Sequence, residues 1–329
     1  MKKLKTLLVG YGYWGPNIAR NLNNIEQFEF NSIYEIDLDI HSQIQIDYPE
    51  ATVYSSLNEI GSDYDCVFIS TPATTHFDLA KHFLNLGVHV FVEKPLTIKS
   101  KDSKALIDLA NKNNLKLMVG HTYLHHPAIL KIKELINSGI IGDIYCVHSE
   151  RLNLGQIRQD INVMWNLAPH DFSIICYLLG EYPKEIKAIG NKHINDNIED
   201  IVYIDLKFEN GIKGFVHNSW LHPLKSRKVI VTGSKGMILF DDTKKNNQLL
   251  FYEKGINWDK FQKNKKGKNS RFELIDGDVL TLDFESKEPL KSEISAFANW
   301  IIDGIIPLSD SKNGHEIVKI LEKAQSQLL

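Results

Sequence analysis

TLLVGYGYWGPNIAR, residues 6–20, decides the fold of this chain. Leu7–Val9 is a short apolar run, as expected for a strand of a parallel sheet that is covered on both faces. Gly10, Gly12 and Gly15 follow with the spacing G-x-G-x-x-G. One glycine permits a tight turn, one lets the backbone approach a pyrophosphate, and one packs a helix against the strand. The stretch therefore predicts a strand, turn and helix that bind a dinucleotide.

An acidic residue stands where such a site needs one. Glu35 lies twenty residues after Gly15 and closes the next apolar segment, Phe30–Ile36. A carboxylate there accepts hydrogen bonds from ribose hydroxyls and repels a ribose 2′-phosphate. The following segment, 36–39, contains no arginine that could receive such a phosphate. The sequence therefore predicts NAD rather than NADP as the cofactor.

Composition indicates a globular protein of two domains. The chain has 329 residues, 43% hydrophobic and 24% charged, with a formal net charge of −3. That charge gives no electrostatic reason to expect nucleic acid or a membrane surface as partner. Cys66, Cys146 and Cys176 are far apart and odd in number, which favours free thiols in a reducing cytoplasm over disulfides. No Cys or His cluster has zinc-like spacing, so no metal is expected.

Residues 1–122 alternate short apolar runs with helical stretches, which predicts a doubly wound parallel sheet. Three of its expected strands end at Thr71, Lys94 and His121. Ligands of open α/β sheets lie beyond the carboxyl ends of the strands, so these residues should line one crevice.

Residues 123–329 predict a second domain, a mostly antiparallel open sheet with a few helices on one face. One helix is expected to begin near His170 and to end at Gly180. The expected strands and closing helices are Ile144–Ser149, Glu185–Ile189, Ile201–Phe208, Ile212–Asn218, Lys228–Thr232, Met237–Phe240, then the helices Ser292–Asp303 and Gly314–Leu328, which can pack back on the first domain. The basic segment 254–271 is expected to be a solvated loop; the alternative is that its lysines meet phosphates.

Four motifs together resemble the Gfo/Idh/MocA oxidoreductases. They are GYGYWG (residues 10–15), STPATTH (70–76), VEKP (92–95) and APHD (168–171). The resemblance covers essentially the whole chain and implies a Rossmann domain followed by an open-sheet domain. It also implies hydride transfer between NAD or NADP and a carbinol carbon of a sugar, inositol or nucleotide sugar, and oligomerisation through the open sheet. A cis Lys94–Pro95 peptide is a further implication.

Matching these motifs residue by residue gives the expected cofactor site. It consists of the glycine-rich turn, the acid after the second strand, and the ends of the fourth and fifth strands: Gly10, Gly12, Tyr13, Trp14, Gly15, Glu35, Thr71, Pro72, His76, Glu93 and Lys94.

Lys94 and His170 are the expected catalytic residues, and both are also expected to contact substrate. Oxidation of a secondary alcohol releases a proton, so a base or relay is required. Partial burial next to a cationic nicotinamide would favour the neutral, basic form of Lys94. Family members carry Asp four residues before the histidine, whereas this chain has Asn166, which can bind a sugar hydroxyl but accepts no proton. That difference concentrates proton transfer on Lys94 and His170, with Asp171 as an orienting partner or an acid of the first helical turn.

The polar segment 150–162 is the expected substrate loop. Arg151 and Arg158 suit bidentate binding of a phosphate, while Asn153 and Asn162 suit sugar hydroxyls. The alternative is an irregular loop held by internal Arg–carboxylate pairs. With the turn at Trp14, the loop resembles the branch acting on nucleotide-linked sugars, such as the UDP-acetamido-sugar-uronate 3-dehydrogenases. Tyr123 and His125 are further possible lining residues.

Three functions remain open from the sequence. The first is an NAD-dependent dehydrogenase of a ring hydroxyl of a nucleotide-linked sugar. The second is the same chemistry on a free sugar or an inositol. The third is a dinucleotide-sensing regulator that has lost turnover, a reading for which Asn166 is the supporting feature.

Overall fold

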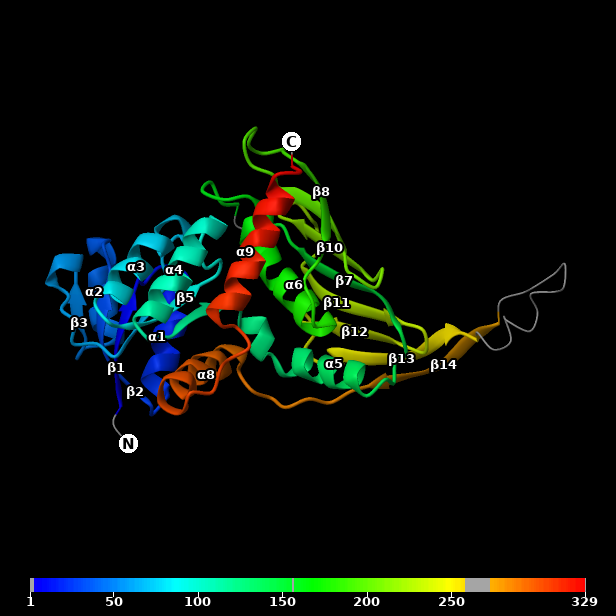
Figure 1. The fold of residues 1–329 in the computed structure, drawn as a ribbon, viewed down its shortest axis with the longest axis horizontal. Coiled ribbons are helices and arrows are strands. Elements are labelled where there is room, and N and C mark those ends of the chain that lie inside the picture. Colours follow the sequence, from blue (N-terminus) through cyan, green and yellow to red (C-terminus); the bar gives the residue numbers. More distant parts are fainter. Residues whose placement is uncertain (1–2, 156, 258–272, 329) are drawn as a thin grey trace. The chain divides into compact units, whose positions relative to one another are not determined.

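The computed structural model describes residues 3–155, 157–257 and 273–328. The chain divides into two compact units (Figure 1). The first consists of Met1–His126 and Lys287–Glu322, and the second of Pro127–Ser286 and Lys323–Leu329. The predicted fold class is confirmed: one unit is built on a parallel sheet and the other on a mostly antiparallel sheet.

The sheet of the first unit has six parallel strands in the order β3-β2-β1-β4-β5-β6. The order reverses between β1 and β4, which is where open α/β sheets bind ligands. The strands are β1 (Leu4–Val9), β2 (Phe28–Tyr34), β3 (Thr52–Tyr54), β4 (Cys66–Ile69), β5 (His89–Glu93) and β6 (Leu117–Gly120).

Helices cover both faces of this sheet because its central strands are apolar on both sides. Helix α1 (Gly15–Asn24) contacts α8 (Pro289–Asp303), and both share a core with β1, β4 and β5. In that core the Phe68 ring stacks on Phe91 at 4.9 Å and meets the edge of Phe297 of α8 at 5.4 Å. Helices α3 (His76–Asn85) and α4 (Ser100–Lys112) contact each other; α3 also contacts β4 and β5, and α4 contacts β6. The short helix α2 (His41–Asp47) follows β2 in the chain.

The second unit contains an eight-stranded sheet in the order β14-β13-β12-β11-β7-β10-β9-β8. Neighbours are antiparallel, except that β7 and β10 run parallel. The strands are β7 (Ile144–Leu152), β8 (Glu185–Asn191), β9 (Ile201–Lys207), β10 (Lys213–Ser219), β11 (Ser226–Gly233), β12 (Met237–Asp241), β13 (Leu249–Ile256) and β14 (Leu274–Thr281).

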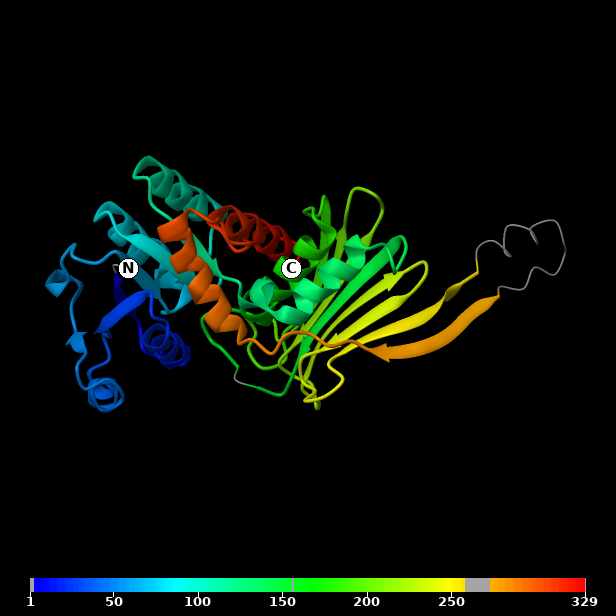
Figure 2. The same ribbon diagram turned by 90° about the horizontal axis from the view of Figure 1, so that it is seen from below.

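One face of this sheet carries the helices of the unit. Helix α6 (Val163–Leu179) contacts β7, β9 and β10, and α5 (Pro127–Asn137) contacts α6. Figure 2 shows both helices on the same side of the sheet. The last helix, α9 (Ser311–Gln325), contains residues of both units. No helix in the described part of the chain is long and apolar enough to span a bilayer.

Two local predictions were wrong. Helix α6 begins at Val163, seven residues before His170, because Pro169 lies inside the helix rather than in its first turn. Strands β13 and β14 were not among the predicted strands; residues 254–256 of β13 pair with β14 and not with β12, so the two continue past β12 as an antiparallel pair (Figures 1 and 2). Of the basic segment 254–271, residues 254–256 belong to β13, and 258–271 lie outside the described residues.

Candidate functional site

The glycine-rich turn of the first unit has the shape that a dinucleotide requires. Gly10 has φ +93°, and a Cβ on it would lie 2.6 Å from the Ser70 carbonyl oxygen. A Cβ on Gly15 would lie 2.5 Å from the Gly10 carbonyl oxygen. Both glycines are therefore required by packing. Gly12, in contrast, has no neighbouring atom within 4 Å of its Cβ position among the described residues, so a phosphate can approach its backbone closely.

Helix α1 begins directly after this turn. Trp14 is its N-cap residue and offers no side-chain acceptor, and Pro16 stands in the first turn. The first amide groups of the helix are thus not capped by a side chain among the described residues, which is the arrangement that favours an anion at a helix N-terminus. Tyr13 and Trp14 are 89% and 38% exposed. The residues present fit a bound dinucleotide.

Glu35 lies one residue after β2 and is buried. Its carboxylate accepts hydrogen bonds from the amides of Tyr11 at 2.6 Å and Asp37 at 2.9 Å. The acid is therefore fixed against the glycine-rich turn, with further lone pairs left to accept from a ribose. The next residues, 36–39, include the exposed Ile36 and Leu38 and contain no lysine or arginine.

His76 links the segments that follow β4 and β5 through hydrogen bonds of its ring. Its ring nitrogens lie 2.9 Å from the Thr71 carbonyl oxygen and 2.8 Å from that of Pro95. Burial lowers the pKa of His76, while the two carbonyls oppose that shift. Thr71 shares a hydroxyl–hydroxyl bond of 2.7 Å with Thr75, next to Pro72. His76 therefore shapes the backbone around Lys94 rather than presenting a free imidazole.

Lys94 directly follows β5, and its peptide with Pro95 is cis, as the resemblance implied. Lys94 is half-buried, and its amide donates to the Glu93 carboxylate at 3.2 Å. Burial lowers the pKa of His76 and of His121, and the positive charge of Lys94 adds to both shifts. A half-buried amine at the carboxyl end of a central strand is positioned as a candidate base.

The helical turn after β6 holds Tyr123 and His125. The Tyr123 ring stacks on His126 with centroids 6.0 Å apart. His125 is buried, with Nε2 3.0 Å from the Ser309 hydroxyl. The His121 ring lies 2.7 Å from Asn313.

Sequence reasoning did not find Ser309, Asn313 or Glu293, whose hydroxyl, amide and carboxyl belong to the distant segment 287–322 and carry no motif.

The second unit holds the other predicted group on α6. Asn162 caps this helix: its side-chain oxygen accepts from the Trp165 amide at 3.0 Å, and its amide donates to Glu199 at 2.6 Å. The Asn162 side chain is thus used by the fold. Asn166 and His170 lie four residues apart in the continuous helix, hence one turn apart, and both are half-buried.

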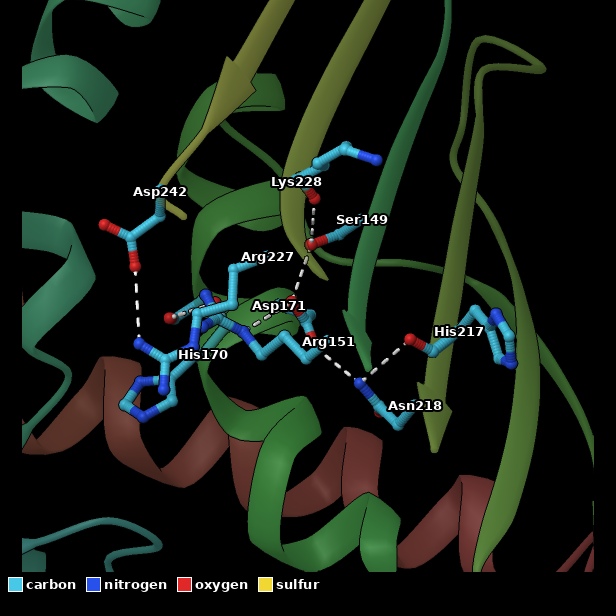
Figure 3. Close-up of polar contacts among 10 residues, drawn as sticks. Ser149, Arg151, His170, Asp171, His217, Asn218, Arg227, Lys228 and Asp242 are labelled. Atoms are coloured by element: carbon cyan, nitrogen blue, oxygen red, sulfur yellow. Dashed lines mark hydrogen bonds and ion pairs between the residues drawn. The ribbon is translucent and has the colours of Figure 1, made fainter. Parts of the chain in front are cut away.

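Arg151 and Asp171, the residue that follows His170 in α6, form a buried ion pair (Figure 3). The Arg151 Nε lies 2.9 Å from Asp171, and their side chains are 7% and 0% exposed. Asp171 also accepts from Ser149 at 2.6 Å and from Asn218 at 2.8 Å. Asp171 lies mid-helix, not in a first turn. This cluster joins α6 to β7 and β10 and fixes the turn of helix that carries His170.

Arg158 is also paired with a carboxylate. It makes two bonds with Asp160, from Nε at 2.9 Å and from the guanidinium end at 2.8 Å, and its side chain is 38% exposed. Asn153 folds over Gly155, with its amide nitrogen 2.1 Å from that residue's Cβ position. A phosphate bound by Arg158 would share the guanidinium with Asp160 or replace it.

The structure therefore gathers the cofactor residues within the first unit and the loop, helix and histidine within the second. Among the residues that the structure describes, no group of three or more His, Cys, Asp or Glu could hold a metal ion.

Known proteins agree with this arrangement. Residues 4–121 match the model of an oxidoreductase family with an NAD-binding Rossmann fold, GFO_IDH_MocA, and residues 129–239 match the GFO/IDH/MocA C-terminal domain. The chain is 28% identical over 202 residues to UDP-N-acetylglucosamine 3-dehydrogenase of Acidithiobacillus ferrooxidans, covering 60% of this chain and 62% of that protein. It is 25% identical over 261 residues to myo-inositol 2-dehydrogenase of Thermotoga maritima, covering 75% and 78%.

A solved structure shows the same fold from end to end. That of UDP-N-acetylglucosamine 3-dehydrogenase from A. ferrooxidans superimposes with a TM-score of 0.81 at 23% identity, covering 100% of this chain and 98% of that one. With both domain models matched in sequence order, the chain belongs to the Gfo/Idh/MocA family of NAD-binding oxidoreductases.

Proposed function

We propose that this protein is an NAD-dependent dehydrogenase that oxidises or reduces a ring carbinol of a nucleotide-linked sugar. The observation that carries the proposal is Lys94: a half-buried amine at the carboxyl end of β5, in the unit whose glycine-rich turn fits a dinucleotide. The similarity to a UDP-N-acetylglucosamine 3-dehydrogenase supports the sugar class.

The chemistry divides between cofactor and side chains. Bound NAD would accept the hydride from the carbinol carbon, and the hydroxyl proton must leave to a base. Lys94 in its neutral form takes that proton or stabilises the oxygen that loses it. His170 serves as the second base or relay, held by a helix that the Arg151–Asp171 pair anchors. Each residue can be tested by itself.

The choice of NAD rests on Glu35. A carboxylate fixed by two backbone amides repels a ribose 2′-phosphate, and no arginine follows in residues 36–39. We expect a lower KM for NAD⁺ than for NADP⁺; the reverse order would contradict the assignment.

The substrate class is tested by a panel of UDP-linked acetamido sugars, free sugars and inositols, each added with NAD⁺ while nicotinamide reduction is followed. Reduction with a UDP-linked sugar, and weaker UDP binding by Arg158→Ala, are expected. The similarity to a myo-inositol 2-dehydrogenase supports the second candidate, which reduction by inositol alone would establish.

We further propose that the protein assembles as a homo-oligomer through the open face of its eight-stranded sheet. Apolar side chains are exposed there: Ile189 (71%), Tyr203 (50%) and Phe215 (40%), with Tyr203 stacked on His217 at 4.0 Å. The free thiols of Cys66, Cys146 and Cys176 fit the proposed cytoplasmic location. Light scattering of the purified protein tests the assembly: a monomer at all concentrations would refute it.

A further inference from the structure

Two carboxyl groups are buried together behind Lys94 in the first unit. Glu93, the last residue of β5, is 8% exposed, and Glu293 of α8 is 0% exposed. The Glu93 carboxyl lies against β6 at Gly120, where a Cβ would come within 3.0 Å of both its oxygens. Glu293 accepts a hydrogen bond from Thr122, two residues after Gly120, so both carboxyls lie at the carboxyl end of β6. The two acids therefore form a buried pair.

The hydrogen bonds of the pair leave acceptors without a donor. Thr122 donates to Glu293 Oε2 at 2.7 Å, and the Lys94 amide to Glu93 Oε2 at 3.2 Å. The other oxygen of each carboxyl, and Nε2 of His121, have no hydrogen-bond partner among the described residues. His121 Nδ1 faces the acceptor oxygen of Asn313, so the ring proton lies on Nδ1 and Nε2 is an acceptor. A proton on one carboxyl would supply the missing donor.

Electrostatics favours the same proton. Burial raises the pKa of Glu93 to about 7, against the opposing effects of the Lys94 charge and of the hydrogen bond from the Lys94 amide. Burial, and then the charge of Glu93, raise the pKa of Glu293 well above its ordinary value. Two neighbouring carboxyls in a dry site do not both ionise at neutral pH.

Lys94 adjoins Glu93 in the chain, donates its amide to the Glu93 carboxyl, and carries the positive charge that acts on it. Burial lowers the pKa of His121 and of His125 to about 4, and also lowers that of His76, so these rings are neutral at pH 7. The charge of the carboxyl pair therefore acts mainly on Lys94.

We propose that Glu93 and Glu293 share one proton as a buried carboxyl pair, and that Glu293 acts through this pair as a positioning residue that governs the pH at which Lys94 loses its charge. The proposal rests on the function proposed for Lys94. While the pair holds its proton, one negative charge at most lies beside the ammonium group. When the pair loses it, a second charge stabilises the ammonium form and opposes formation of the neutral base.

The test follows Lys94 itself, in the cofactor-free protein. In protein labelled with isotopic lysine, the NMR signal of Lys94 is assigned by its loss in Lys94→Met and titrated with pH. Glu293→Gln, which keeps the volume and the acceptor for Thr122, should lower the Lys94 midpoint by about half a pH unit or more, and Glu93→Gln by about one unit or more, because each variant leaves a single carboxyl that can place no second negative charge beside the ammonium group. Infrared spectroscopy of the wild-type protein should show a protonated carboxyl at neutral pH that Glu293→Gln diminishes.

Glu288→Gln is the matched control. It removes an acid from the same helix, but Glu288 is exposed and paired with Arg20, so the Lys94 midpoint should not move. An unchanged midpoint in Glu293→Gln, with or without a shift in Glu93→Gln, would overturn the proposal, as would the absence of a protonated carboxyl at neutral pH. Because no turnover is measured, an inactive protein could still pass this test and an active dehydrogenase could fail it.

Discussion

Asp171 and Glu293 are both fully buried acids, yet their surroundings differ. Asp171 in the second unit receives bonds from Ser149, Asn218 and the guanidinium of Arg151. Glu293 in the first unit receives one bond from the described residues, from Thr122, and has another acid beside it. Burial alone therefore does not set the role of an acid: its donors do. The comparison separates a carboxylate that holds a helix in place from a carboxyl that stores a proton.

The largest expected effect comes from removing the donor cation of Asp171. Arg151→Met leaves the carboxylate buried with neutral donors only, so the free energy of unfolding should fall by about 3–5 kcal/mol. Denaturant unfolding followed by fluorescence measures it. Arg158→Met is the matched control, because its exposed pair with Asp160 is worth about 1 kcal/mol or less. Equal losses in the two variants would remove the distinction between the acids.

The next effect concerns the dependence of stability on pH. Burial raises the pKa of Glu93 from its ordinary value of 4.5 to about 7 in the folded protein. Its stabilising contribution is thus fully present below pH 4.5 and is lost as the pH rises to 7, at no more than about 1.4 kcal/mol per pH unit. Glu93→Gln should flatten this part of the stability profile, measured by urea unfolding at a series of pH values. A wild-type profile that Glu93→Gln leaves unchanged would show that the carboxyl is already ionised.

Glu293 should show the same trend. Burial and the charge of Glu93 raise its pKa well above the ordinary value, so its ionisation destabilises the fold as the pH rises, and Glu293→Gln should be more stable than the wild-type protein in alkaline buffer but not at pH 5. The difference in melting temperature between the two pH values reports it. A variant that is less stable at both would assign Glu293 a packing role only.

The smallest effect is expected at the exposed end of α8. Glu288→Gln breaks bonds to Arg20 and Asn21 at the protein surface, and the free energy of unfolding should fall by about 1 kcal/mol or less. Calorimetry at neutral pH measures this change. A larger loss would mean that an exposed acid of α8 contributes as much to stability as a buried one, which would contradict the difference expected between Glu288 and Glu293.

The same contrast explains what could be predicted from the sequence. The cofactor side is encoded locally: a strand, three glycines and an acid twenty residues later predict the turn, the helix and the place of Glu35. The location of Lys94 on the cofactor side could also be predicted, because the carboxyl ends of the strands in a parallel sheet lie at one edge. Glu293 and Asn313 come from helices far along the chain, and their pairing with β5 and β6 depends on the tertiary fold alone.

The second unit was harder to predict for similar reasons. A helix start was expected near His170, but the helix begins at Val163, Asn162 provides its cap, and Pro169 lies inside it among buried neighbours. Arg151 has the chemistry of a phosphate ligand, and only the structure shows that its Nε is bonded to Asp171. The hairpin of β13 and β14 was missed because β14 is exposed along its length and lacks an alternating pattern.

Lys94 is proposed to support hydride transfer between NAD and a sugar carbinol. The most direct test adds NAD⁺ and UDP-linked acetamido sugars to the wild-type protein and to Lys94→Ala and follows the absorbance of reduced nicotinamide. Calorimetry measures the binding of NAD⁺ to both proteins. We expect reduction with a UDP-linked sugar, a rate lower by about 10²–10⁴-fold in Lys94→Ala, and binding of NAD⁺ by both proteins. Binding of NAD⁺ without reduction by any sugar or inositol, or full activity of Lys94→Ala, would contradict it.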